Sequence, residues 1–134
     1  MPLFEFVVEG PAVSLRASKK SRQSRLRYQK WVMFVRRAAE REWPTDVKPT
    51  GSDVEVTISN YHTETPPDVD NIIKPILDAL KGLVYRDDVQ VHKVTSQKFE
   101  LPRETIEHSG VLLARALVRH TEVLHIVVAW EEEE

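Results

Sequence analysis

Four stretches of the chain are predicted to be β-strands, and in the first three of them apolar and polar side chains alternate in the way that strands with one buried face do. The first is the clearest, because Phe4, Phe6 and Val8 recur at every second position and a glutamate follows the first and the last of them. A period of two places such side chains on one face of a strand. The alternation is weakest in the third stretch. The predicted strands are residues 3–9, 53–59, 89–99 and 123–130.

Two other stretches repeat their apolar residues with the 3.6-residue period of an α-helix. In residues 22–43 the apolar and aromatic side chains fall on one face, and Pro44 ends the helix. Residues 71–81 separate an apolar arc from a polar arc that carries Lys74 and Asp78. Both patterns predict helices that bury one face in a core.

The start of the second helix carries two local signals. Asp70 or Asn71 is the expected N-cap, because their short side chains accept hydrogen bonds from the first turn. Pro75 fits the helix only within its first turn, where the missing backbone N–H has no helical partner to lose. We therefore expect the helix to begin at or just after Asn71.

The order of the elements predicts a single α+β domain over residues 1–134. We expect two to three helices on a small mixed sheet of about four strands. Residues 60–67 are expected to form a polar loop. Residues 102–121 are ambiguous, and their part from 111 to 119 is expected to be a short third helix.

Length and composition agree with one globular domain. The 134 residues have a mass of 15.5 kDa, with 41% apolar and 30% charged side chains, which is too apolar for a disordered chain. No apolar run approaches the ~20 residues needed to span a bilayer, and no signal-peptide pattern is present. The absence of cysteine excludes disulfides and thiolate chemistry. We expect a cytoplasmic protein without a membrane partner.

The net charge of −2 hides a strongly basic segment. Residues 16–41 contain ten Lys and Arg residues and a single acid, Glu40, so this segment carries a charge of +9. Contacts with phosphates are local, so such a segment attracts polyanions whatever the net charge. A solvated helix face is the alternative interpretation. The glutamates at residues 131–134 are expected to form a disordered, solubilising tail.

Four aspartates flank the second predicted helix. Asp68 and Asp70 precede it. If that segment is extended, their side chains point the same way, because they are two residues apart. Asp87 and Asp88 follow the helix and meet the first pair only if residues 83–86 run nearly straight, antiparallel to the helix. Gly82 is the kind of residue that permits the reversal. We expect these carboxylates to gather around one ion.

The chemistry of such a cluster favours a hard divalent cation. Two carboxylates ~4 Å apart repel by about 4 kcal/mol at an effective dielectric of 20, and oxygen ligands without cysteine suit Mg²⁺ or Mn²⁺. Lys74 lies on the same face as Asp70 and would orient a water or neutralise a phosphate. With the basic segment, this set describes a phosphodiester hydrolase acting on nucleic acid. The alternative is a salt-bridged exposed helix in which Lys74 pairs with Asp70 or Asp78.

The aspartates and Lys74 follow a pattern that resembles the RusA-type Holliday junction resolvases, a family of endodeoxyribonucleases common in prophages. The family signature reads Asp-x-Asp-Asn-x-x-Lys-x-x-x-Asp-Ala-Leu and, after a short spacer, Asp-Asp-x-x-Val. Here it occupies residues 68–80 and 87–91. A weaker similarity extends to the Gly10-Pro11 turn and the basic segment behind it. Residues 102–121 look longer than the hairpin connection expected of the family.

The resemblance implies a homodimeric α+β protein that makes Mg²⁺-dependent paired incisions across a four-way DNA junction in recombination and repair. By motif position, Asp68, Asp70 and Asp88 would be the metal-binding catalytic acids and Lys74 the catalytic lysine, with Asp87 as a neighbouring acid. Two symmetric cuts need two related sites, which suits a dimer. The residues expected to contact DNA phosphates are Lys19, Lys20, Arg22, Arg25, Arg27 and Lys30.

Two other functions remain open from the sequence. A non-catalytic protein that binds branched DNA would use the basic segment and keep the acidic cluster for structure. A small metal-dependent nucleotide phosphohydrolase would use the acids and leave the basic segment for another partner.

Overall fold

The computed structural model describes residues 2–10, 12, 21–63, 66–100, 110–114 and 122–132. Within these ranges no helix is both long enough and apolar enough to cross a membrane. The elements, in chain order, are β1 (Leu3–Glu9), α1 (Arg22–Glu42), β2 (Val54–His62), α2 (Ile73–Leu80), the 3₁₀ turn η1 (Asp88–Gln90), β3 (Val91–Glu100) and β4 (Val123–Trp130).

The strands form one mixed sheet in the order β1-β4-β2-β3. The last strand lies in the interior of the sheet, antiparallel to β1 on one side and to β2 on the other. The β2 and β3 strands are parallel, and the chain between them contains α2. Parallel strands need such a crossover connection, and a helix is its usual form. The expected α+β class with a small mixed sheet is confirmed.

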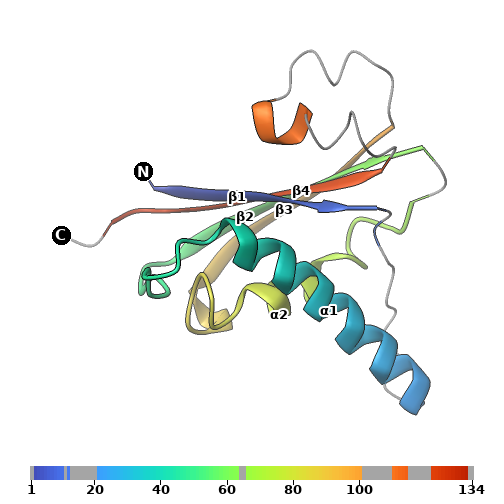
Figure 1. The fold of residues 1–134 in the computed structure, drawn as a ribbon, viewed down its shortest axis with the longest axis horizontal. Coiled ribbons are helices and arrows are strands. Elements are labelled where there is room, and N and C mark those ends of the chain that lie inside the picture. Colours follow the sequence, from blue (N-terminus) through green and yellow to red (C-terminus); the bar gives the residue numbers. More distant parts are fainter. Residues whose placement is uncertain are drawn as a thin grey trace.

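Both helices cover the same face of the sheet (Figure 1). Their apolar faces pack on alternate strand residues, so that Phe6, Val56 and Ile126 are fully buried or nearly so. The helical turn at residues 111–114 lies on the opposite side. There Leu113 packs with Tyr61 and Val123 in a second, smaller cluster. The two helices therefore lie together on one face of the sheet, and the predicted site is on this face.

The strongest sequence patterns predicted their elements well. The first and last strands have the predicted bounds. Helix α1 ends at Glu42, with Trp43 as its C-cap and Pro44 beyond, and buries Trp31 and Val35 on the predicted face. The side chain of Ser21 caps its first turn by accepting a hydrogen bond from the Ser24 N–H.

Two predicted boundaries are wrong. Strand β2 continues to His62, so residues 60–62 are not a loop; Asn60 is 2% exposed and lies between Leu124 and Lys98 in the sheet. Its polar side chain suggested an exposed turn, but pairing on both sides keeps it in the strand. The third strand begins at Val91, after η1. Of the predicted helix at 111–119, residues 111–114 are helical and the rest lie outside the described residues.

The start of α2 also differs from the prediction. The helix begins at Ile73, and its N-cap is Ile72, which makes no side-chain capping bond. Asp70 and Asn71 are thus not the cap. Asn71 instead closes a turn, because its backbone N–H donates to the Asp68 carbonyl at 3.0 Å. Pro75 is the third helical residue, within the first turn as expected.

Candidate functional site

Helix α2 has one buried and one polar face. Ile76 and Leu80 are fully buried, while Lys74 and Lys81 are exposed and Asp78 is half-buried. Helix α1 packs directly against α2, and Arg36 of α1 reaches the backbone carbonyls of Ala79 and Lys81. Of the predicted catalytic side chains, Lys74 therefore lies next to the contact between the two helices.

Asp78 accepts hydrogen bonds on both of its carboxylate oxygens. The Lys74 ammonium donates to Oδ1 at 2.9 Å from the preceding turn of α2. The Tyr28 hydroxyl donates to Oδ2 from α1. The sequence left the partner of Lys74 open between Asp70 and Asp78, and the structure assigns it to Asp78.

These contacts favour the protonated forms of both donors. The hydrogen bond from Lys74 to Asp78 raises the pKa of Lys74, and the charges of Asp78 and Asp88 add to this effect against the opposing effect of desolvation. The pKa of Tyr28 is also raised, first by burial and then by its hydrogen bond to Asp78. At neutral pH Lys74 is therefore a cation and Tyr28 a neutral hydrogen-bond donor.

Asp68 and Asp70 lie in the exposed turn that leads into α2. Strand β3 holds the backbone between them, because the Ser96 hydroxyl donates to the Val69 carbonyl at 2.6 Å. The two carboxylates therefore flank an anchored peptide group and extend into solvent. Such exposed oxygens are accessible to a cation or to water.

Asp88 lies near the other end of α2. The chain does not run straight back along the helix as expected, because Leu83 and Val84 both donate backbone hydrogen bonds to the Leu80 carbonyl. Gly82 closes this tight turn with a φ of 84°, a backbone conformation that glycine adopts readily. Asp88 then pairs with Lys81, with 3.7 Å between Oδ2 and Nζ.

Gln90 fixes the segment that carries Asp87 and Asp88. Its side-chain oxygen accepts the backbone N–H groups of Arg86 and Asp87 at 2.9 and 3.0 Å. Its amide nitrogen donates to the carbonyls of Thr50 and Ser52, both at 2.8 Å. This buried amide joins the acidic turn to the loop before β2, so the turn is held firmly although Asp87 and Asp88 are exposed.

The expected gathering of Asp68, Asp70 and Asp88 around one ion is not found. Among the described residues, which include all three, no group of three or more Asp, Glu or His side chains is close enough together to hold a metal. The tight turn at Gly82 explains part of the difference, because it leaves Asp88 beside Lys81. Mg²⁺ is nevertheless usually bound by one or two carboxylates together with water and substrate phosphates. The exposed carboxylate oxygens of Asp68 and Asp70 are ligands of the type that magnesium prefers.

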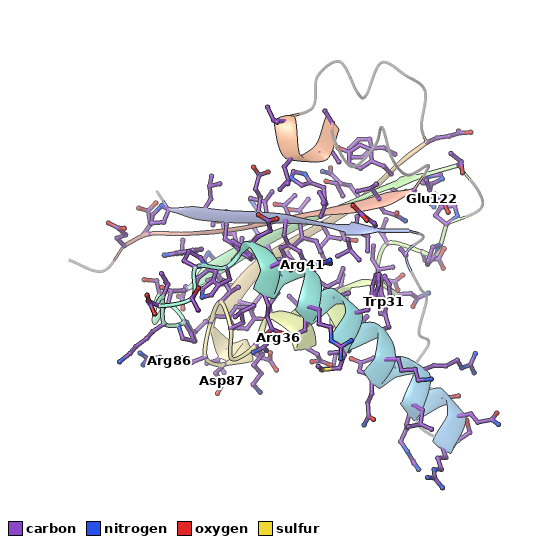
Figure 2. The ribbon with its side chains drawn as sticks, in the orientation of Figure 1. Trp31, Arg36, Arg41, Arg86, Asp87 and Glu122 are labelled. Atoms are coloured by element: carbon purple, nitrogen blue, oxygen red, sulfur yellow. The ribbon has the colours of Figure 1, made fainter. Side chains whose placement is uncertain are left out.

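The proposed phosphate-binding residues that the structure describes line α1. Arg22, Arg25, Arg27 and Lys30 are exposed in the first half of the helix. Lys19 and Lys20 lie outside the described residues. In the second half Arg36 points toward α2, where Nη1 donates to the Lys81 carbonyl at 2.8 Å (Figure 2). The basic helix is therefore tied to α2 at both Tyr28 and Arg36.

Sequence reasoning missed three residues that organise this region. Tyr28 was assigned to the apolar face of its helix, and Gln90 and Arg36 were given no role. The only signal for Tyr28 was its place at the edge of the apolar face, where a hydroxyl can reach out of the core. The local signal for Gln90 was its position three residues after Asp87, since the two form a capping box. Its other partners, Thr50 and Ser52, are about forty positions earlier in the chain and left no local signal.

A basic helix packed on a helix with acidic flanks, against a mixed four-stranded sheet, defines this chain as an α+β domain. The chain belongs to the RusA family: it matches the family described as Endodeoxyribonuclease RusA over residues 11–107. The matched span includes α1, α2 and both acidic motifs, and the family predicted from the sequence is confirmed. No curated protein sequence matches the chain.

Proposed function

We propose that this protein is a Mg²⁺-dependent, structure-selective endodeoxyribonuclease that resolves Holliday junctions by paired phosphodiester cleavage. The observation that carries the proposal is the family match across residues 11–107, which contain the basic helix, Lys74 and the acidic motifs in one span. DNA recombination and repair are the processes that such an activity serves.

In this proposal Asp68 and Asp70 hold the magnesium ion. Asp88 would be the third metal-binding acid, and Asp87 a neighbouring acid. The exposed carboxylates at the entrance of α2 support this assignment. When bound, the ion would supply charge neutralisation at the phosphate and a more acidic water. Mn²⁺ has the same preference for oxygen ligands and would replace it.

Lys74 stabilises negative charge in this mechanism and does not act as a base. Its raised pKa keeps the ammonium protonated at neutral pH, so it has no capacity to take a proton from the attacking water. A fixed cation near the reacting phosphate lowers the energy of the transition state, in which charge develops on the phosphate oxygens. The pair with Asp78 holds the ammonium on the polar face of α2.

Branched DNA is the proposed partner of the basic helix. Lys19, Lys20, Arg22, Arg25, Arg27 and Lys30 would contact its phosphates. A homodimer would supply the second active site that two symmetric incisions need. The packing of α1 on α2 supports a path for DNA from the basic face to the acidic motifs.

The direct test is a synthetic four-way junction incubated with and without Mg²⁺ and analysed on a denaturing gel. We expect symmetric nicks only with Mg²⁺, and no cleavage by Asp70→Asn, which should still bind the junction because the basic helix is unchanged. A linear duplex of the same sequence serves as the control substrate. Equal cleavage by wild type and Asp70→Asn would contradict the role given to Asp70.

The pairing of acids with lysines favours a second candidate, a non-catalytic protein that binds branched DNA. Asp78 pairs with Lys74 and Asp88 with Lys81, as expected if these acids serve structure. This candidate predicts junction binding without Mg²⁺-dependent nicks, so the same gel together with a binding assay separates the two functions. Turnover of free nucleotides without junction cleavage would instead indicate a phosphohydrolase.

A further inference from the structure

Tyr28, Asp78 and Lys74 form one chain of hydrogen bonds that crosses from α1 to α2. The tyrosine hydroxyl donates to one carboxylate oxygen, and the lysine ammonium donates to the other at 2.9 Å. We infer that Tyr28 is a positioning residue that holds Lys74 in place through the carboxylate of Asp78. The inference rests on the proposed function, in which Lys74 is the catalytic cation.

The pair between Lys74 and Asp78 would be weak without a third group. Lys74 is four residues before Asp78 on the helix surface and its side chain is 67% exposed. Exposed ion pairs with this spacing hold a long side chain only loosely, because solvent screens them and ordering the chain costs entropy. Asp78 is only 27% exposed, so it is the member of the pair that the fold can anchor.

Tyr28 supplies that anchor from the neighbouring helix. Its hydroxyl donates a hydrogen bond to Oδ2 of Asp78, and the other carboxylate oxygen, Oδ1, accepts the hydrogen bond from Lys74. The hydroxyl remains a donor at neutral pH, because burial and the carboxylate both raise the pKa of Tyr28. The carboxylate is therefore restrained on both sides, and its orientation sets the position of the ammonium.

Because Tyr28 belongs to α1, the proposed DNA-binding helix is the element that restrains Lys74. Tyr28 lies between Arg25 and Lys30 in the sequence of α1. The same helix would thus bind phosphates and hold the cation that acts on them. A phosphate bound by α1 and the ammonium of Lys74 would be aligned by one rigid connection, which is the kind of alignment that raises the rate of a chemical step.

The test combines single variants with a double-mutant cycle on a four-way junction. Tyr28→Phe should lower kcat about tenfold and leave KM within about twofold, because it changes the position of Lys74 and removes no contact to DNA. In an Asp78→Asn background Tyr28→Phe should alter kcat by less than about twofold, because the carboxylate that connects Tyr28 to Lys74 is already lost. Additive losses in the cycle would overturn the inference.

Tyr85→Phe is the matched control. The Tyr85 hydroxyl also contacts α2, but it donates to the Leu77 carbonyl and not to Asp78. If Tyr28 only supplied a tyrosine hydrogen bond that stabilises α2, removing either hydroxyl would have a similar effect. An equal loss of kcat in the two variants would therefore overturn the inference, whereas a loss confined to Tyr28→Phe supports it.

A second readout does not depend on cleavage. An ammonium group held in a hydrogen bond exchanges its protons slowly and gives a signal in ¹H–¹⁵N spectra that select lysine NH₃⁺ groups. We expect the Lys74 signal in wild type and Tyr85→Phe and its loss in Tyr28→Phe. Its persistence in Tyr28→Phe would overturn the inference. If wild type cleaves no junction, the proposed function fails, and this spectrum still decides whether Tyr28 holds Lys74.

Discussion

At the scale of single residues, buried polar groups with several partners do most to fix the acidic turn. Gln90 is 8% exposed, and its amide both accepts and donates two hydrogen bonds. A buried amide that is fully satisfied stabilises the fold, and the loss of its partners leaves other buried groups without hydrogen bonds. The turn that carries Asp87 and Asp88 thus depends on one side chain.

Gln90→Glu should destabilise the protein by about 2 kcal/mol or more, because an ionised carboxylate cannot donate to the carbonyls of Thr50 and Ser52. Urea denaturation of the variant and the wild type measures this loss. Gln29→Glu is the control, since Gln29 is exposed on α1, and it should change stability by less than about 0.5 kcal/mol. Equal effects of the two changes would contradict the role of Gln90.

The partner of Lys74 illustrates how far a side-chain contact can be predicted from the sequence. Helical spacing correctly placed Lys74 and Asp78 on one face, but it allowed Asp70 as an equal partner. That choice depends on where the helix begins. Because α2 starts at Ile73, Asp70 lies outside it and the i,i+4 geometry no longer holds for that pair.

At the scale of elements, α1 stabilises the end of α2. The Arg36 guanidinium donates to the carbonyls of Lys81 and Ala79 at 2.8 and 3.3 Å. The last carbonyls of a helix have no partners within the helix, and a cation near them also interacts favourably with the helix dipole. Arg36 therefore acts as a C-terminal cap supplied by another helix.

Arg36→Met should cost about 1–2 kcal/mol of stability and increase amide hydrogen exchange at Leu83 and Val84, whose N–H groups bond the Leu80 carbonyl. Arg37→Met removes the same charge from an exposed neighbour on α1. That control should leave both stability and exchange nearly unchanged. If the two variants behave alike, net charge rather than the cap accounts for the effect.

Local pattern predicted elements well where burial alternates strictly, as in β1. It failed at the end of β2, since Asn60 is polar yet 2% exposed. The pairing of β2 on both sides overrides the local preference of such residues for a turn. A sequence pattern does not show which strands will flank a residue, and such boundaries become visible only in the assembled sheet.

At the scale of the whole molecule, the basic helix α1 lies on one face of the sheet (Figure 1). Lys93 lies beside Glu55 in the register of β2 and β3. Glu55 stands between Val54 and Val56, which are buried in the core under the helices, so Glu55 and Lys93 lie on the other face. The net charge of −2 therefore does not describe the surface that DNA would approach. Strand order, which sets this arrangement, was not predictable from local patterns.

Arg27→Ala and Lys30→Ala should each reduce the slope of log K against log salt for junction binding by about one unit, because each removes one phosphate contact. Fluorescence anisotropy without divalent cations, at several salt concentrations, measures the slope. Lys93→Ala should leave it unchanged. An unchanged slope for Arg27→Ala or Lys30→Ala would remove that residue from the binding surface.

The interior position of β4 has a consequence for how the protein is made. As the chain leaves the ribosome, β1 is the first of the four strands to emerge, but its neighbour in the sheet is β4, the last of them in chain order. The nascent sheet therefore lacks the strand between β1 and β2 until residues 123–130 have been synthesised. A stop codon before residue 123 would leave β1 and β2 without the strand that joins them, even though the acidic motifs would already have been translated.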